Sequence, residues 1–155
     1  METIQFIINK LKVYDEVAKT TSYIGSRMEE GAYLRIFTTD EDRTMLERFW
    51  IESADTANEQ LKRYIMDVND NESGEYDLAN DYQVTLEVSS RYDTAFTNSI
   101  SNSLYNYFVN NILCKWFFIT NKEEASAYAT NATAMMDDVK RKLAYKRKPT
   151  RIIPM

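Results

Sequence analysis

The sequence predicts a mainly α protein: a four-helix bundle with a small β element and an extended basic arm after the last helix. The 155 residues include only three Gly and two Pro, so few turns are forced and long helices with short connections are expected. Apolar residues recur at spacings of three and four along most of the chain, and one stretch alternates with a period of two. The length favours a single domain, residues 1–145, followed by the arm, residues 146–155.

The first two helices are expected over residues 2–28 and from about residue 40 to 65. Thr38 and Glu41 fit a capping box at the start of the second helix, and the acidic run that begins at Asp40 complements the helix dipole. The apolar stripe of the first helix consists of Ile4, Ile7, Leu11, Tyr14 and Ala18. The stripe of the second consists of Met45, Leu46, Phe49, Trp50, Ala54, Ala57, Leu61, Tyr64 and Ile65.

Residues 67–93 are expected to form an acidic loop and a strand inserted between helices. In residues 82–89 the apolar positions Tyr82, Val84, Leu86 and Val88 alternate with polar ones, which predicts a half-buried strand. A lone strand needs a partner. Within the chain the candidate is residues 33–37; otherwise Val84, Leu86 and Val88 would pair with a strand of another subunit.

The third and fourth helices are expected over residues 94–119 and from residue 121 onward. The third carries a run of aromatic residues in its second half, so it is either the central helix or meets a neighbouring subunit. Asn121 and Glu124 fit a cap at the start of the fourth helix. Pro149 and Pro154 prevent helix near the end of the chain, which predicts an extended arm there.

The composition argues against an enzyme. With no His and one Cys, the chain cannot build the usual zinc sites or a Ser-His-Asp triad. The pattern that starts at Asp67 imitates a calcium loop, but Glu72 stands where Gly is needed and Leu78 where a bidentate Glu is needed. We therefore expect no catalytic residues, no metal and no cofactor. The longest apolar stretch, residues 104–119, is too short to span a bilayer, so no membrane partner is expected.

The net charge of −5 hides a strong asymmetry. Residues 139–155 carry seven cations and no acid, so residues 1–138 carry −12. Some of these cations complement the dipole of the last helix, and the remainder suit either a nucleic acid or an acidic protein surface. Isoleucines and prolines in the arm favour a protein partner. The expected charged anchors are Arg147, Lys148 and Arg151, and the expected apolar anchors are Ile152 and Ile153.

The order of these features resembles the head-tail connector, or adaptor, proteins of tailed bacteriophages. The resemblance begins with a helix, then residues 32–36, the acidic residues 40–42, and a long helix with Leu46, Phe49 and Trp50. The stretches that look like small head and neck proteins of phages and prophages of gut Bacteroidales are residues 33–50, 84–92, 102–128 and 145–151.

The resemblance implies a structural protein of the virion neck that is made in the cytoplasm of the bacterial host. It would form a homo-oligomeric ring, commonly twelvefold in the family, beneath the portal protein, and would offer a platform for an adjacent neck or tail protein. The ring would continue the channel through which genome DNA passes without sequence-specific binding. The alternative function is that of a nucleic-acid-binding accessory protein acting through the basic arm.

Overall fold

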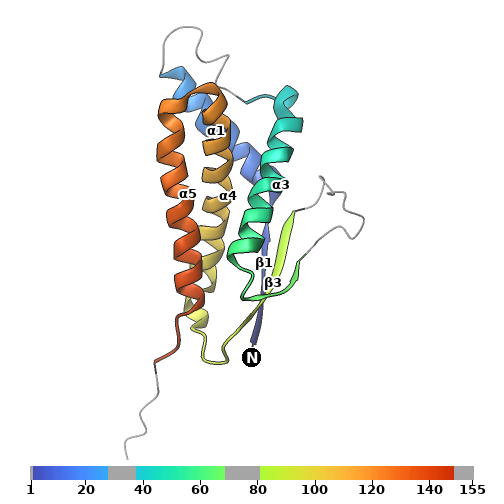
Figure 1. The fold of residues 1–155 in the computed structure, drawn as a ribbon, viewed down its shortest axis with the longest axis vertical. Helices are drawn as coiled ribbons and strands as arrows, with labels where there is room; N and C mark the ends of the chain where they lie inside the picture. Colours follow the sequence, from blue (N-terminus) through green and yellow to red (C-terminus); the bar gives the residue numbers. More distant parts are fainter. Residues whose placement is uncertain (1, 28–37, 69–80, 149–155) are drawn as a thin grey trace, which may run out of the picture.

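In a computed structural model, the described residues 2–27, 38–68 and 81–148 form four α-helices and a three-stranded antiparallel sheet (Figure 1). The mainly α class expected from the sequence is confirmed, and the β part is larger than expected. The elements in chain order are β1 (Glu2–Ile8), α1 (Lys10–Ser26), the 3-10 helix η1 (Asp40–Asp42), α3 (Arg43–Gln60), β2 (Ile65–Val68), β3 (Tyr82–Val88), the 3-10 helix η2 (Thr94–Phe96), α4 (Thr97–Thr120) and α5 (Lys122–Leu143).

The sheet has the order β1-β3-β2, so the predicted strand β3 lies in its centre. β1 pairs with β3 along its whole length, from Glu2 opposite Val88 to Ile8 opposite Tyr82. β2 pairs with the other side of β3. Both edges of β3 are therefore used by strands of this chain, and not by a strand of another subunit as one of the two expectations had it. The other expected partner, residues 33–37, lies outside the described residues.

The expectation of one helix over residues 2–28 is wrong for its first turns. Residues 2–8 form a strand in which Phe6 and Ile8 are buried, whereas Ile7 is 53% exposed. Asn9 then caps α1, because its side-chain oxygen accepts a hydrogen bond from the backbone N–H of Lys12 at 2.8 Å. The apolar residues of this stretch fit both the helical spacing and the two-residue spacing of a strand. It forms a strand because it pairs with β3.

The second helix begins later than predicted: the 3-10 helix η1 occupies Asp40–Asp42, and α3 starts at Arg43. Thr39, and not Thr38, makes the capping contact: its backbone N–H donates to the Asp42 carboxylate at 2.9 Å and its hydroxyl donates to the same oxygen at 3.2 Å. Thr38 is instead buried against α1, where its N–H donates to the hydroxyl oxygen of Thr21 at 3.2 Å. This tertiary contact removes Thr38 from the capping position.

The second helix also ends earlier than expected, at Gln60. The chain turns at residues 61–64, and Ile65, which was assigned to the helical stripe, begins β2 opposite Leu86. The apolar spacing continues across this turn because Leu61 and Ile65 both face the common core. Spacing alone therefore does not locate the end of α3.

The third and fourth helices are confirmed, with η2 preceding α4 by one turn. α4 and α5 form an antiparallel hairpin that spans the molecule (Figure 1). Asn121 occupies the N-cap position of α5, but its side chain makes no capping hydrogen bond. The expected capping box with Glu124 is reduced to a backbone hydrogen bond from the Glu124 N–H to the Asn121 carbonyl at 3.1 Å.

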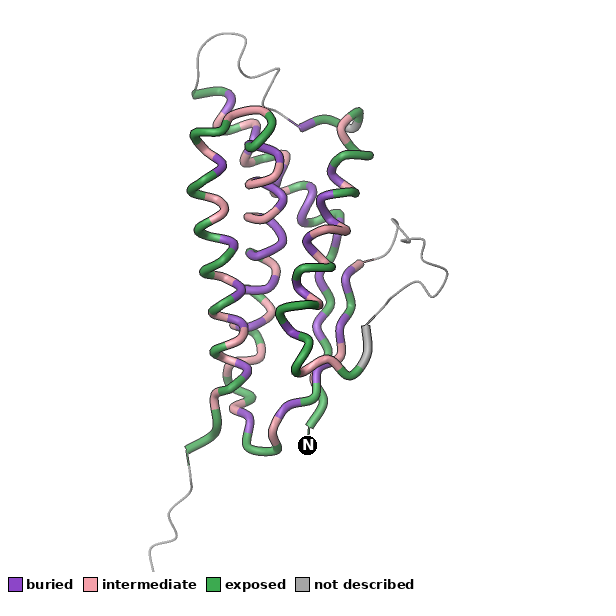
Figure 2. Tube along the Cα trace, viewed as in Figure 1, coloured by how far each residue is buried: buried purple, intermediate pink, exposed green. Residues whose placement is uncertain are grey.

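One hydrophobic core joins the helices to the inner face of the sheet, and Figure 2 shows the buried positions along the facing sides of these elements. At its centre the ring of Phe108 lies 4.6 Å from Trp50 of α3 and 4.9 Å from Tyr82 of β3, centroid to centroid. The aromatic end of α4 is only partly internal: Phe117 is buried, whereas Phe118 is 64% exposed. α4 is thus the central helix, as one of the two sequence interpretations proposed.

Candidate functional site: the basic end and the edge groove

The first of the predicted anchors, Arg147, is bound to its own chain. Its backbone N–H donates to the Arg91 carbonyl at 2.7 Å, and its guanidinium donates to the Ser90 carbonyl at 3.0 Å. Lys148 is exposed and ends the described part of the arm. Three further predicted anchors, Arg151, Ile152 and Ile153, lie outside the described residues.

The beginning of the arm runs antiparallel to the connection between β3 and α4. Tyr92 and Lys146 form a β-bridge, and the Asp93 N–H donates to the Tyr145 carbonyl at 3.1 Å. The ring of Tyr145 meets Phe96 edge-on, with centroids 5.0 Å apart. Because these contacts flank the Arg147 hydrogen bonds, residues 145–147 are held in place on the connection after β3. The start of the arm therefore has a fixed position.

This arrangement gathers exposed cations at one end of the molecule, which we call the basic end. Its members come from α5, from the arm and from the connection after β3, and they are Arg91, Arg141, Lys146, Arg147 and Lys148. Sequence reasoning missed Arg91, because it belongs to this group only through the bridge that joins residues more than 50 positions apart. An isolated arginine after a strand carries no sequence signal of such a contact.

Not every cation of this region is available to a partner. The Asp138 carboxylate contacts both Arg141 and Lys142 and accepts a hydrogen bond from the Ser103 hydroxyl at 2.7 Å. The hydrogen bond from Lys142 is the largest influence that lowers the pKa of Asp138 below its usual range. Lys140 donates to the Gln60 side chain at 2.7 Å. The cations of α5 thus serve the fold first. Arg91, Lys146 and Lys148 are the exposed cations of the basic end that an anionic partner could contact.

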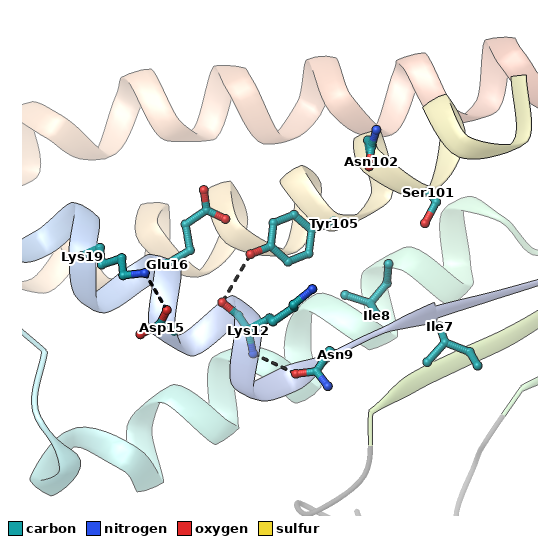
Figure 3. Close-up of a pocket in the computed structure, with 10 residues that line it drawn as sticks. All are labelled: Ile7, Ile8, Asn9, Lys12, Asp15, Glu16, Lys19, Ser101, Asn102 and Tyr105. Atoms are coloured by element: carbon teal, nitrogen blue, oxygen red, sulfur yellow. Dashed lines mark hydrogen bonds and ion pairs between the residues drawn. The ribbon is translucent and has the colours of Figure 1, made fainter.

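A second feature is a groove of about 600 Å³ between the end of β1, α1 and the first half of α4, which we call the edge groove (Figure 3). Tyr105 of α4 closes it by donating to the carbonyl of Lys12 at 3.2 Å, and Asp15 pairs with Lys19 at 2.9 Å on the α1 wall. Burial, and next a hydrogen bond to Glu16, raises the pKa of Tyr105, so the phenol stays protonated. The lining residues are Ile7, Ile8, Asn9, Lys12, Asp15, Glu16, Lys19, Ser101, Asn102 and Tyr105.

The strand residues offered as a pairing surface are part of the core. Val84 and Val88 are each 1% exposed and Leu86 is fully buried. Since β3 also has a neighbouring strand on both sides, these residues take part in holding the domain together. The edge strands of the described sheet are β1 and β2, and the edge of β1 lies next to the edge groove.

Across residues 2–27, 38–68 and 81–148, no three His, Cys, Asp or Glu side chains converge to hold a metal ion. None of the helices in the described part of the chain is long and apolar enough to cross a membrane.

Comparison of the chain with family models, with curated proteins and with solved structures finds no match.

Proposed function

We propose that this protein is a structural subunit of a tailed-phage neck: a head-tail connector, or adaptor, that assembles into a ring beneath the portal protein. The observation that carries the proposal is the basic end, where hydrogen bonds hold residues 145–147 on the connection after β3. A basic segment that departs from a fixed point on an otherwise acidic body suits docking onto another protein. The resemblance of the sequence to phage connector proteins supplies the class of partner.

The shape of the molecule supports a ring. α4 and α5 have 24 and 22 residues, so each is about 33 to 36 Å long at 1.5 Å per residue. An antiparallel pair of this length can stand beside copies of itself around an axis. The negative charge of residues 1–138 suits the wall of a channel, because carboxylates repel phosphates and let DNA pass without adhering.

The basic end and the arm would bind the portal or the adjacent ring subunit, and the opposite end would be left for the next neck or tail protein. In this proposal Arg147 acts mainly within the chain, since its guanidinium is bound to the Ser90 carbonyl. Arg91 and Lys148 take the role of charged contacts, together with Arg151 of the arm.

The test is binding to the portal protein encoded in the same genome. A variant that lacks residues 149–155 keeps every contact of residues 145–147, so it should fold and yet lose most of its affinity for assembled portal rings in co-sedimentation. Charge reversal by Arg91→Glu with Lys148→Glu should weaken binding strongly, whereas the control Lys62→Glu, an exposed cation outside the basic end, should not. Full affinity of the shortened variant would contradict the proposed docking.

The basic end also favours one alternative, the nucleic-acid-binding accessory protein. In that case duplex DNA would bind the full-length chain with an affinity that falls steeply as salt rises, because phosphate contacts release counterions. The same double charge reversal would abolish this binding. Salt-dependent DNA binding together with no affinity for the portal would replace the connector proposal by this one.

A further inference from the structure

We propose that the edge groove binds residues 149–155 of a second copy of this chain, as an extended segment that adds to the free edge of β1. The inference deepens the proposed ring and rests on it for its biological setting, because it names the contact between adjacent subunits. Its physical basis is independent of the portal.

The first step is the position of the groove at a strand edge. Successive side chains of a strand point to opposite faces of the sheet. The side chains of Ile7 and Ile8 extend to opposite sides of β1, and yet both line the groove (Figure 3). The groove can contact both faces of the strand only if it runs along the edge of β1. That edge is the one not paired with β3, since β1 is one of the two outer strands of the described sheet. Unpaired backbone groups on such an edge can accept another extended chain.

The second step is size. The α1 wall of the groove runs from Asn9 to Lys19, a rise of about 15 Å at 1.5 Å per residue. An extended segment of four residues covers about 13 Å. Residues 149–155 contain Thr150–Ile153 between two prolines, and proline cannot donate to a β ladder. The part able to pair is thus four residues long, which fits the groove.

The third step is chemistry. Ile7 lines the groove and is 53% exposed, although it is a large apolar side chain. Ile152 or Ile153 of the arm would cover it. The charged side chains that line the groove balance, because Lys12 and Lys19 stand against Asp15 and Glu16. Specificity for the arm would therefore come from backbone pairing and apolar contact, and not from the charge of the groove.

The choice of a second copy follows from direction and overall charge. Beyond the end of α5 the described chain leads away from the helices (Figure 1). Residues 145–147 are tied to the connection after β3, so the arm is not free to swing from its base. The net charge of −12 on residues 1–138 of one molecule attracts the four cations of residues 146–155 of another.

The test uses a synthetic peptide of residues 146–155 and the full-length protein, with binding followed by fluorescence anisotropy. We expect binding that Ile7→Arg weakens by roughly tenfold or more, since about 1.4 kcal/mol of lost contact corresponds to a factor of ten. The matched control is Met66→Arg, because Met66 is also an exposed apolar residue on an outer strand, β2, at 62% exposure. No binding, or equal weakening by both substitutions, overturns the inference.

A second measurement identifies which molecule supplies the arm. A photo-crosslinking amino acid at position 152 should link to peptides containing residues 7–19 or 101–105. With a mixture of ordinary and ¹⁵N-labelled protein, about half of the links between copies should join chains of different isotope. Links that join only a chain to itself would show that the arm folds back on its own groove and would refute a contact between copies.

The two proposals fail separately. Peptide binding and crosslinks at the groove without any affinity for the portal would leave this contact standing and remove the connector function. Portal binding without peptide binding or crosslinks would leave the connector function and remove this contact.

Discussion

The strand β1 can be tested by mutation, because the sequence pattern and the structure disagree about which of two neighbouring residues, Phe6 or Ile7, is buried. If residues 2–8 were helical with the stripe of Ile4, Ile7 and Leu11, Ile7 would face the core. In the structure Phe6 is 2% exposed and pairs with Val84, whereas Ile7 is 53% exposed. Alanine substitutions at positions 6 and 7 therefore decide between the two.

Phe6→Ala removes a buried aromatic side chain and leaves a cavity, so it should lower the free energy of unfolding by about 3–5 kcal/mol. Ile7→Ala alters an exposed site and should change it by no more than about 0.5 kcal/mol. Small domains have total stabilities of about 5–15 kcal/mol, so the first loss is large. The assay is urea unfolding followed by circular dichroism. A cost for Ile7→Ala equal to or greater than that for Phe6→Ala would refute the strand.

Two further predictions concern polar contacts between helices. Asp138→Asn should lower stability by about 1–3 kcal/mol at neutral pH, since it removes charge-assisted hydrogen bonds. The pKa of Asp138 is lower in the folded protein, so the wild type holds this extra stability above the unfolded pKa of about 3.9 and loses it as the pH falls through the folded pKa. In urea titrations from pH 7 to pH 3, the free energies of unfolding of wild type and variant should therefore converge. A difference in stability that stays constant with pH would contradict the prediction. Tyr107→Phe should cost about 1 kcal/mol in the same assay at pH 7, because the buried hydroxyl donates to the Ser53 carbonyl at 2.9 Å, and an unchanged stability would show that this bond contributes nothing.

The elements that the sequence predicts well are those whose pattern is long and unambiguous. α4 and α5 fall within a few residues of their expected bounds, because apolar spacing over more than 20 positions outweighs local exceptions. The strand at residues 82–88 follows from four alternating pairs. These features depend on the local chain, which is why residue order reveals them.

What could not be predicted depends on contacts between distant segments. Residues 2–8 fit either period, and only their pairing with β3 makes them a strand. Thr38 fits a capping box but is taken by Thr21 of α1. The same limit applies to the site: the positive charge of the arm is visible in the sequence, whereas Arg91 joins it only through the bridge between Tyr92 and Lys146.

The connector function itself is tested most directly by cryo-electron microscopy of assembled portal rings mixed with the full-length protein. The account predicts an additional ring of this chain, coaxial with the portal, around an open channel, with the basic end turned toward the portal or the neighbouring subunit. Portal rings that remain bare at saturating protein concentration, or chains bound away from the channel axis, would contradict it.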